Sequence, residues 1–417
     1  MREMRDSGIE WVGAIPAAWG VHRIASHFQE IKEKNTANAY SNALQFKMGK
    51  IIAKPQKWDE DETNETYSAY TVVHPNTIMI NGLNLEFDFV TQRVARVECD
   101  GIITSAYIAL SPRDDINAEY ICYLLKSYDA CRAFHSMGRG LRKILSYSEL
   151  KNKPLVVPPL VEQERIAAFL DAQCAEIDAV LEKTRASIEE YKKLKQAVIT
   201  QAVTKGIRGD RPMKDSGIEW IGTCPLNWTV CRIKNVIFPQ EKEVLPDDEI
   251  ITCFRDGEVT LRKNRREDGF TVSFTEHGYH GVDKGDLVIH GMDAFAGAIG
   301  CSDSRGKTTP VVHTCKTAGN NRFFMYFLRS MAYGNILMDL SNGVRIRSSD
   351  FRNFAKLGVF GAVMPSLEEQ NEIVDYIDGI VIQMDRLIQK KENLLTEIEN
   401  YKKSLIYEYV TGKKEVV

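Results

Sequence analysis

The sequence predicts an α+β protein made of two repeats and two long helices that pair as an antiparallel coiled coil. The first observation behind this prediction is a duplicated opening. Asp6-Ser7-Gly8-Ile9-Glu10-Trp11-Val12-Gly13 returns as Asp215-Ser216-Gly217-Ile218-Glu219-Trp220-Ile221-Gly222, an offset of 209 residues from Asp6 to Asp215. The second is a segment of about 40 residues after each repeat with apolar residues at seven-residue spacing. A period near half of the 417 residues indicates a duplicated domain pair rather than a solenoid.

The repeat continues past its opening. A proline and a second tryptophan follow each copy at the same spacing, as Pro16 and Trp19 and then as Pro225 and Trp228. Further matches join 75–82 with 284–291, 101–104 with 306–309, 122–127 with 325–330, 140–142 with 343–345, and 158–166 with 365–373. The offset drifts by a few residues, as loop insertions would make it. We therefore divide the chain into a first repeat domain (1–157), a first helix (158–207), a second repeat domain (208–363), a second helix (364–412) and a tail (413–417).

The composition is that of an ordinary globular protein, with 44% hydrophobic and 27% charged residues. Neither a long apolar run nor an apolar signal region at the N-terminus is present, so we expect no membrane span and a cytoplasmic location. The nine cysteines are dispersed without a Cys-x-x-Cys pair, which indicates reduced thiols. The net charge of −3 gives no general attraction to nucleic acid, so any such contact must come from local clusters.

The two helical segments have the pattern of a coiled-coil stripe, with Glu and Lys between the apolar positions. A helix of about 40 residues is about 60 Å long and cannot bury such a stripe alone. Because the second repeat domain lies between the segments, we expect the second helix to return antiparallel beside the first; the alternative is that each helix lies on its own domain. Our candidates for the seam or for contact with partner subunits are Ile166, Leu170, Ile177, Leu181, Ile188, Tyr191, Ile377, Met384, Leu387, Leu394, Ile398 and Tyr401.

The repeat domains have mixed secondary-structure signals. Residues 77–80, 102–110 and 286–289 are typical of strands, and 120–126 and 323–329 are typical of short helices. Clusters of Gly and Asn separate these segments and predict turns. The two copies diverge most over residues 30–70 and 240–280, where we expect any difference in what they recognise.

We find no motif that predicts covalent chemistry. Gly300 to Thr308 has five residues between its glycines, where a phosphate-binding loop needs four. His277 and His280 have no neighbouring Cys or Glu ligand, which favours an ordinary loop over a metal site. We therefore expect no catalytic residue, metal or cofactor on this chain.

Several motifs together resemble type I restriction–modification specificity subunits. They are the Trp-x-Gly-x-x-Pro-x-x-Trp opening at 11–19 and 220–228, the Pro-Pro-Leu-x-Glu-Gln-x-x-Ile helix start at 158–166, and its second copy at 365–373. The second copy departs from the first by having Ser366 in place of Pro159. The resemblance covers essentially the whole chain.

This resemblance implies two target recognition domains, 1–157 and 208–363, each reading one half of a bipartite asymmetric site in double-stranded DNA, with a helical spacer that sets their separation. Two modification (methyltransferase) subunits would supply adenine N6 methylation with S-adenosylmethionine. Two restriction (helicase–nuclease) subunits would add cleavage with ATP and Mg. The chain itself would be a non-catalytic subunit. The alternatives are a stand-alone DNA-binding or scaffold protein without enzyme partners, and an enzyme with an unrecognised site.

Base reading needs donors and acceptors that reach base edges, and Arg, Lys and Asn are the usual ones. Because Arg142 and Arg345 are equivalent in the two repeats, we expect them to contact phosphate, or else to form a scaffold ion pair. For Trp11, Trp19, Trp220 and Trp228 packing is favoured over base stacking. The candidate DNA-binding residues are Asn81, Asn84, Arg139, Arg142 and Lys143 in the first domain, and Arg255, Arg262, Lys263, Arg265, Arg266, His290, Arg345 and Arg347 in the second.

Overall fold

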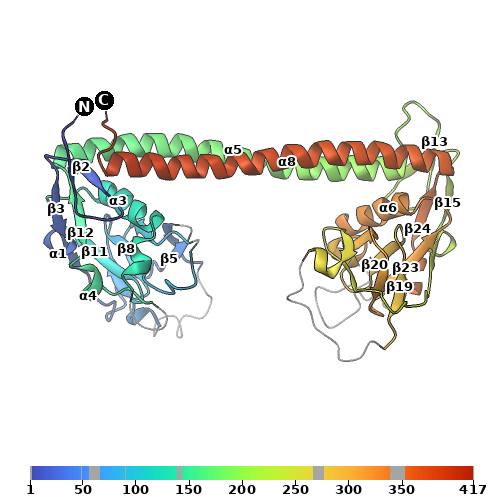
Figure 1. Ribbon diagram of the computed structural model, residues 1–417, viewed down its shortest axis with the longest axis horizontal. Helices are drawn as coiled ribbons and strands as arrows, with labels where there is room; N and C mark the ends of the chain where they lie inside the picture. Colours follow the sequence, from blue (N-terminus) through green and yellow to red (C-terminus); the bar gives the residue numbers. More distant parts are fainter. Residues whose placement is uncertain are drawn as a thin grey trace. The chain divides into compact units, whose positions relative to one another are not determined.

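The computed structural model describes residues 2–47, 49–55, 66–89, 91–138, 143–265, 277–338 and 353–416. The chain forms two compact units. Unit 1 contains Met1–Arg185 and Asn393–Val417, and unit 2 contains Ala186–Glu392. Each unit therefore holds one repeat together with the start of one long helix and the end of the other (Figure 1).

Unit 1 is built around a four-stranded antiparallel sheet in the order β4-β11-β8-β9. The sheet strands are β4 (Phe28–Glu30), β11 (Ile108–Pro112), β8 (Ile78–Ile80) and β9 (Val94–Arg96). Antiparallel pairs surround it: β1 (Met4–Asp6) with β2 (Ala14–Pro16), β3 (Gly20–Arg23) with β12 (Pro154–Val157), β5 (Leu44–Lys47) with β6 (Lys50–Ala53), and β7 (Thr71–Val73) with β10 (Gly101–Ile103). Its helices besides the long ones include α1 (Ile24–His27), α3 (Ala118–Ala130) and α4 (Tyr147–Leu150).

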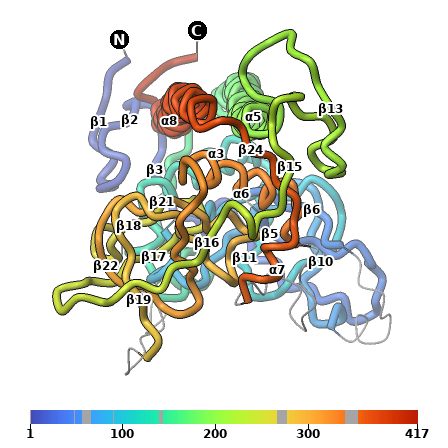
Figure 2. The backbone as a smooth tube through the Cα atoms, turned by 90° about the vertical axis from the view of Figure 1, so that its right-hand side faces the viewer, coloured from blue at the N-terminus to red at the C-terminus, as the bar shows by residue number. Residues whose placement is uncertain are grey.

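Unit 2 repeats this topology strand for strand, with its sheet in the order β16-β23-β20-β21. These strands are β16 (Ile237–Pro239), β23 (Val312–Thr317), β20 (Leu287–His290) and β21 (Ile299–Cys301). The surrounding pairs are β13 (Met213–Asp215) with β14 (Thr223–Pro225), β15 (Thr229–Arg232) with β24 (Gly361–Met364), β17 (Ile251–Cys253) with β18 (Val259–Leu261), and β19 (His280–Val282) with β22 (Gly306–Thr308); β15 and β24 run side by side in Figure 2. Its shorter helices include α6 (Asn321–Tyr333) and α7 (Ala355–Gly358). The duplication and the α+β class are confirmed.

Local chemistry explains where some elements differ from the prediction. The helices predicted from Tyr120 and Phe323 begin earlier because Asn117 and Asn320 cap them, accepting hydrogen bonds from Tyr120 N at 2.8 Å and Arg322 N at 2.8 Å. The strand predicted over 102–110 is two strands, β10 and β11, because a turn interrupts the run between them.

The long helices are α5 (Leu160–Lys205) and α8 (Leu367–Val410). In unit 1, Asp178 pairs with Lys402 at 2.6 Å and Arg185 pairs with Glu399 at 2.5 Å. In unit 2, Lys195 pairs with Asp385 at 2.5 Å, and Lys391 Nζ lies 5.6 Å from the centre of the Tyr191 ring. Residue numbers fall along α8 as they rise along α5, so the helices run antiparallel within each unit. This confirms the predicted pairing over the alternative of two separate helices.

The seam differs from the prediction at three positions. Leu387, Leu394 and Tyr401 are 42%, 43% and 57% exposed, whereas Ile388 is 7% exposed. The seven-residue series 387, 394 and 401 lies one position from the buried stripe, and spacing alone cannot separate two adjacent stripes. Of the other candidates, Ile166, Leu170, Leu181, Ile188 and Ile377 are buried, and Ile177, Tyr191, Met384 and Ile398 are half-buried. Contact of the three exposed residues with partner subunits stays a prediction.

Each unit has its own core between its helix pair and its sheet. In unit 1 this core contains Trp19, Tyr120 and Leu170, and in unit 2 it contains Trp228, Phe323 and Ile377. Figure 1 shows α3 and α6 in this intermediate layer. Among the described residues, no helix combines the length and apolarity needed to cross a membrane.

Candidate nucleic-acid interface

The duplicated opening forms the same structure in both units. Gly8 N donates to Asp6 Oδ1 at 3.0 Å, and Gly217 N donates to Asp215 Oδ1 at 3.0 Å. The glycines at both turns, 8 and 13 and their equivalents 217 and 222, have φ between 66° and 71°, a conformation that glycine adopts without strain. The opening is therefore retained for its backbone geometry.

The tryptophan that ends each opening connects it to a long helix. Trp19 Nε1 donates to Glu162 Oε2 at 2.9 Å, and Trp228 Nε1 donates to Glu369 Oε2 at 3.0 Å. Both rings are 2% exposed or less, which confirms that they are packing residues. The other predicted pair, Trp11 and Trp220, are half-buried and pack on Tyr128 and Phe327.

The Glu-Gln pair at each helix start is also structural. Gln163 Oε1 accepts from Asn117 N at 2.9 Å while its Nε2 donates to Pro158 O at 2.9 Å. Gln370 makes the same two bonds, to Asn320 N at 2.8 Å and Pro365 O at 2.9 Å. The motif residues thus hold the scaffold in both units.

The turn at the end of the equivalent strands β8 and β20 begins with a polar residue in both units: Asn81 follows β8 directly, and His290 is the last residue of β20. We call residues 81–84 and 290–293 the donor turns. Asn81 Oδ1 accepts from Leu83 N at 3.1 Å, and His290 Nδ1 accepts from Met292 N at 3.3 Å and Asp293 N at 3.1 Å. In both side chains the acceptor atom is used within the turn. A donor that the turn does not use remains: Nδ2 in Asn81 and Nε2–H in His290. The two residues that the repeat alignment pairs therefore occupy one structural position.

In unit 1 a buried arginine that the sequence analysis missed shapes the donor turn. Arg93 is fully buried, and its guanidinium donates to the carbonyl oxygens of Leu83 at 2.7 Å and Asp88 at 2.6 Å, with longer bonds to Asn81 and Asn84. In the sequence Arg93 is one of two arginines in a short run with Arg96, and nothing distinguishes it from that half-buried neighbour. Four carbonyl groups on one planar cation fix the loop that carries Asn84.

The same loop presents aromatic rings to solvent. Phe87 is 76% exposed and Phe89 is 54% exposed. Phe89 stacks on His135 with ring centroids 5.0 Å apart, and the Arg132 guanidinium lies 5.3 Å from its centre. Lys143 is exposed. It lies near the donor turn because Leu145 N donates to Gly82 O at 2.9 Å and holds this segment against the turn. The described candidates of unit 1 therefore come together around the donor turn, on two segments that this bond joins.

In unit 2 four of the candidates line one cavity of about 690 Å³, which we call the arginine cavity: Arg255, Arg262, Arg265 and His290. Arg255 pairs with Asp293 at 2.9 Å, and Arg262 Nε donates to Thr252 Oγ1 at 3.3 Å. Gly300 allows this arrangement: a Cβ there would lie 2.1 Å from Gly257 O, in the turn between β17 and β18 that also contains Arg255.

Electrostatics keep the arginine cavity polar at neutral pH. Arg265 lies 4.2 Å from the ring centre of Phe254 and pairs with Asp256 at 2.6 Å, and this hydrogen bond lowers the pKa of the Asp256 carboxyl. Burial lowers the pKa of His290, so the imidazole is neutral and donates from Nε2. Guanidinium groups and a neutral donor on one surface are suited to guanine and phosphate acceptors.

Not every candidate converges on these two places. Lys263 pairs with Glu249 at 2.5 Å and does not line the arginine cavity. Arg139, Arg142, Arg266, Arg345 and Arg347 lie outside the described residues. The described ranges contain no group of three or more His, Cys, Asp or Glu residues arranged to hold a metal ion.

The fold and these surfaces define a class of protein: a duplicated α+β scaffold on paired helices, with a different polar surface around the donor turn of each repeat. No protein-family model matches the chain. The chain is 22% identical over 97% of its length to the putative type I restriction enzyme MjaX specificity subunit of Methanocaldococcus jannaschii, and the alignment covers 96% of that protein. It is 24% identical to the type I restriction enzyme EcoBI specificity subunit of Escherichia coli over 65% of this chain and 60% of the relative.

A solved structure shows the same fold. It is described as the structural basis underlying complex assembly and conformational transition of the type I R-M system, and it superimposes with a TM-score of 0.69 at 14% identity, covering 96% of this chain and 99% of that one. Sequence relatives and fold together confirm the resemblance to type I restriction–modification specificity subunits.

Proposed function

We propose that this chain is the DNA sequence specificity subunit of a type I restriction–modification system. Residues 1–157 and 208–363 are its two target recognition domains, 158–207 and 364–412 are the helices that set the spacer, and 413–417 is a tail. It performs no catalysis. Its partners are double-stranded DNA, two modification subunits that use S-adenosylmethionine, and two restriction subunits that use ATP and Mg, all in the cytoplasm.

The observation that carries this proposal is the equivalence of Asn81 and His290. One scaffold position in each unit has a hydrogen-bond donor beyond those needed for its own turn. The neighbours then differ: the exposed aromatic pair in unit 1, and the arginine cavity in unit 2. A shared position with unlike neighbours is what two readers of unlike half-sites require, since bases are distinguished by the donors and acceptors that face them.

Specificity of this kind needs no catalytic group on the reading chain. The repeated motif residues are engaged in scaffold bonds, such as those of Trp19 with Glu162 and of Gln163 with Asn117. The chain decides where chemistry occurs, and the partner subunits carry it out.

Selection from random double-stranded DNA tests the proposal, with the full chain co-purified with its co-encoded modification subunits. We expect enriched sequences with two unlike constant blocks separated by a gap of fixed length and variable sequence. A single continuous block, or no enrichment over non-specific binding, would favour a stand-alone DNA-binding protein or a scaffold. The salt concentration must be held constant, because phosphate contacts make the affinity strongly salt-dependent.

A further inference from the structure

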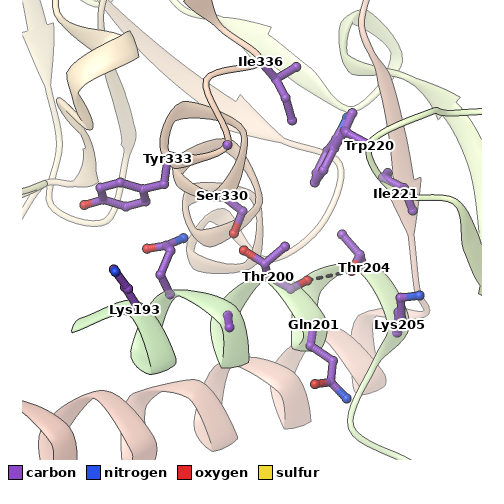
Figure 3. Close-up of a pocket in the computed structure, with 13 residues that line it drawn as sticks. Lys193, Thr200, Gln201, Thr204, Lys205, Trp220, Ile221, Ser330, Tyr333 and Ile336 are labelled. Atoms are coloured by element: carbon purple, nitrogen blue, oxygen red, sulfur yellow. Dashed lines mark hydrogen bonds between the residues drawn. The ribbon is translucent and has the colours of Figure 1, made fainter. Parts of the chain in front are cut away.

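A second cavity in unit 2 lies away from the arginine cavity and shares no lining residue with it. It is open, about 970 Å³ in volume, and we call it the Trp220 cavity. Its walls are the last turns of α5, the opening residues Trp220 and Ile221, and the end of α6 (Figure 3). Thr200, Ser330 and Trp220 surround the space between these elements.

Unit 1 shows what fills the equivalent place. Tyr407 on α8 corresponds to Thr200 on α5, since Thr411 Oγ1 donates to Tyr407 O at 2.6 Å and Thr204 Oγ1 donates to Thr200 O at 2.6 Å. Tyr407 Oη donates to the carbonyl oxygen of Val12 at 2.9 Å. Lys413 Nζ donates to the same oxygen at 2.6 Å and lies 4.7 Å from the centre of the Tyr407 ring. A phenol and an ammonium group thus close this place in unit 1.

Unit 2 has the equivalent carbonyl acceptor but lacks the phenol that binds it in unit 1. Threonine at position 200 has no ring, and Ile221, the equivalent of Val12, has a carbonyl oxygen that no donor within the described ranges reaches. Gln196 Nε2 is buried at this cavity and likewise lacks a partner among the described residues. The indole nitrogen of Trp220 is also buried and unpaired, but so is that of Trp11, so the indole does not distinguish the two units.

The charge of the lining indicates what accompanies the ring. Lys193 and Lys205 are among the lining residues, and no Asp or Glu is. Neither lysine forms an ion pair within the described part of the chain. An acidic segment would therefore be attracted to this surface, and a basic one repelled.

We propose that the Trp220 cavity binds a tyrosine side chain from an acidic segment of a partner protein. Its hydroxyl donates to the Ile221 carbonyl, as Tyr407 does to Val12, and accepts from Gln196. The bound ring takes the place that Tyr407 fills from within the chain in unit 1. The site is separate from the DNA surfaces, so it stands or fails independently of which bases are read.

Fluorine NMR of the full chain labelled with 5-fluorotryptophan tests this. The chain has five tryptophans, and a Trp220→Phe variant assigns the reporter signal. The probes are p-cresol and acetylated, amidated tripeptides: Asp-Tyr-Glu, Asp-Phe-Glu and Lys-Tyr-Lys. We expect saturable shifts of the Trp220 signal with p-cresol and with Asp-Tyr-Glu, binding of Asp-Phe-Glu weakened by about fivefold through loss of the hydroxyl hydrogen bond, and weaker binding of Lys-Tyr-Lys.

Two variants complete the test. Thr200→Tyr places the unit 1 ring in unit 2 and should abolish the Trp220 shift. The double variant Tyr407→Thr with Lys413→Ala removes both groups that donate to the Val12 carbonyl oxygen and should create a site whose probe shifts the Trp11 signal. This double variant keeps the test decisive if Thr200→Tyr does not fold. No Trp220 shift with any probe, equal binding of the tyrosine and phenylalanine peptides, or a shift that persists in folded Thr200→Tyr would overturn the proposal.

Discussion

Unit 1 and unit 2 have the same topology, but the glutamate that connects the opening to the long helix is more deeply buried in unit 2. Glu369, which binds Trp228 and Arg211, has a side chain 2% exposed, whereas the side chain of its counterpart Glu162 is 22% exposed. At the donor turns the difference is chemical: a buried arginine organises an aromatic loop in unit 1, and arginines line a cavity in unit 2. The comparison shows that duplication preserved the bonds between opening and helix while the loops diverged.

The largest loss of stability should come from replacing the buried glutamate of unit 2, Glu369. Replacing Glu369 by alanine leaves the Arg211 charge and the Trp228 donor without a partner, which costs about 3–5 kcal/mol for a buried pair. Glu162→Ala should cost less, about 1–2 kcal/mol, because water reaches that carboxylate. Hydrogen exchange by mass spectrometry, reading each unit separately, measures both. Equal losses in the two units would show that burial does not set the strength of this connection; Glu369→Gln, which can still accept from Trp228, should fall between wild type and Glu369→Ala.

Removing the buried arginine of unit 1, Arg93, should cause the next largest loss of stability. Arg93→Met leaves carbonyl groups of the donor turn unsatisfied, with an expected loss of about 2–4 kcal/mol in unit 1. The half-site read by residues 1–157 should weaken while the other is retained. Urea unfolding and DNA selection measure the two effects. Arg23→Met removes an exposed arginine of the same unit and serves as the control; if both variants lose half-site recognition equally, Arg93 has no special positioning role.

These positions also show what could be predicted from the sequence. The repeats, the long helices and the antiparallel pairing followed from periodicity, because a seven-residue stripe must be buried somewhere. The seam register did not, since Leu387 and Ile388 differ by one position and only packing selects between them. The repeat alignment of 75–82 with 284–291 already pairs Asn81 with His290, but only the structure shows that each side chain accepts a hydrogen bond within its own turn. The sequence analysis did not select Arg93, because a buried cation is recognised only once its carbonyl partners are known.

A smaller effect is expected in the arginine cavity. Arg262→Ala or Arg265→Ala should relax base preference within the second half-site by about 1–3 kcal/mol per position and leave the first half-site unchanged. Lys263→Ala is the matched control, because Lys263 is adjacent in sequence but paired with Glu249 outside the cavity. Competition binding against single-base variants of the selected DNA measures the preference. Loss of preference in both half-sites would contradict separate reading by the two units.

The smallest expected effect is a pH dependence at the donor turn. The pKa of His290 lies below the ordinary 6.5 in the folded chain, so as pH falls through 6.5 the unfolded state takes up a proton that the folded state does not, and stability declines. His280 contributes in the same direction, because burial also lowers its pKa. His290→Asn installs the residue of unit 1, keeps an acceptor for the turn and should reduce the slope, by no more than about 1.4 kcal/mol per pH unit. An unchanged slope between pH 7.5 and 5 would show that His290 does not carry this dependence.

The central claim is that the two units read separate halves of one DNA site. The most direct test maps methylated adenines across the genome of cells that express the co-encoded modification subunits with the wild-type chain or with a double variant, Arg262→Ala with Arg265→Ala. We expect a bipartite motif that requires this chain, with the second half relaxed in the variant while the first half and the gap stay the same. A motif that persists without the chain, or one in which both halves change together, would contradict the claim.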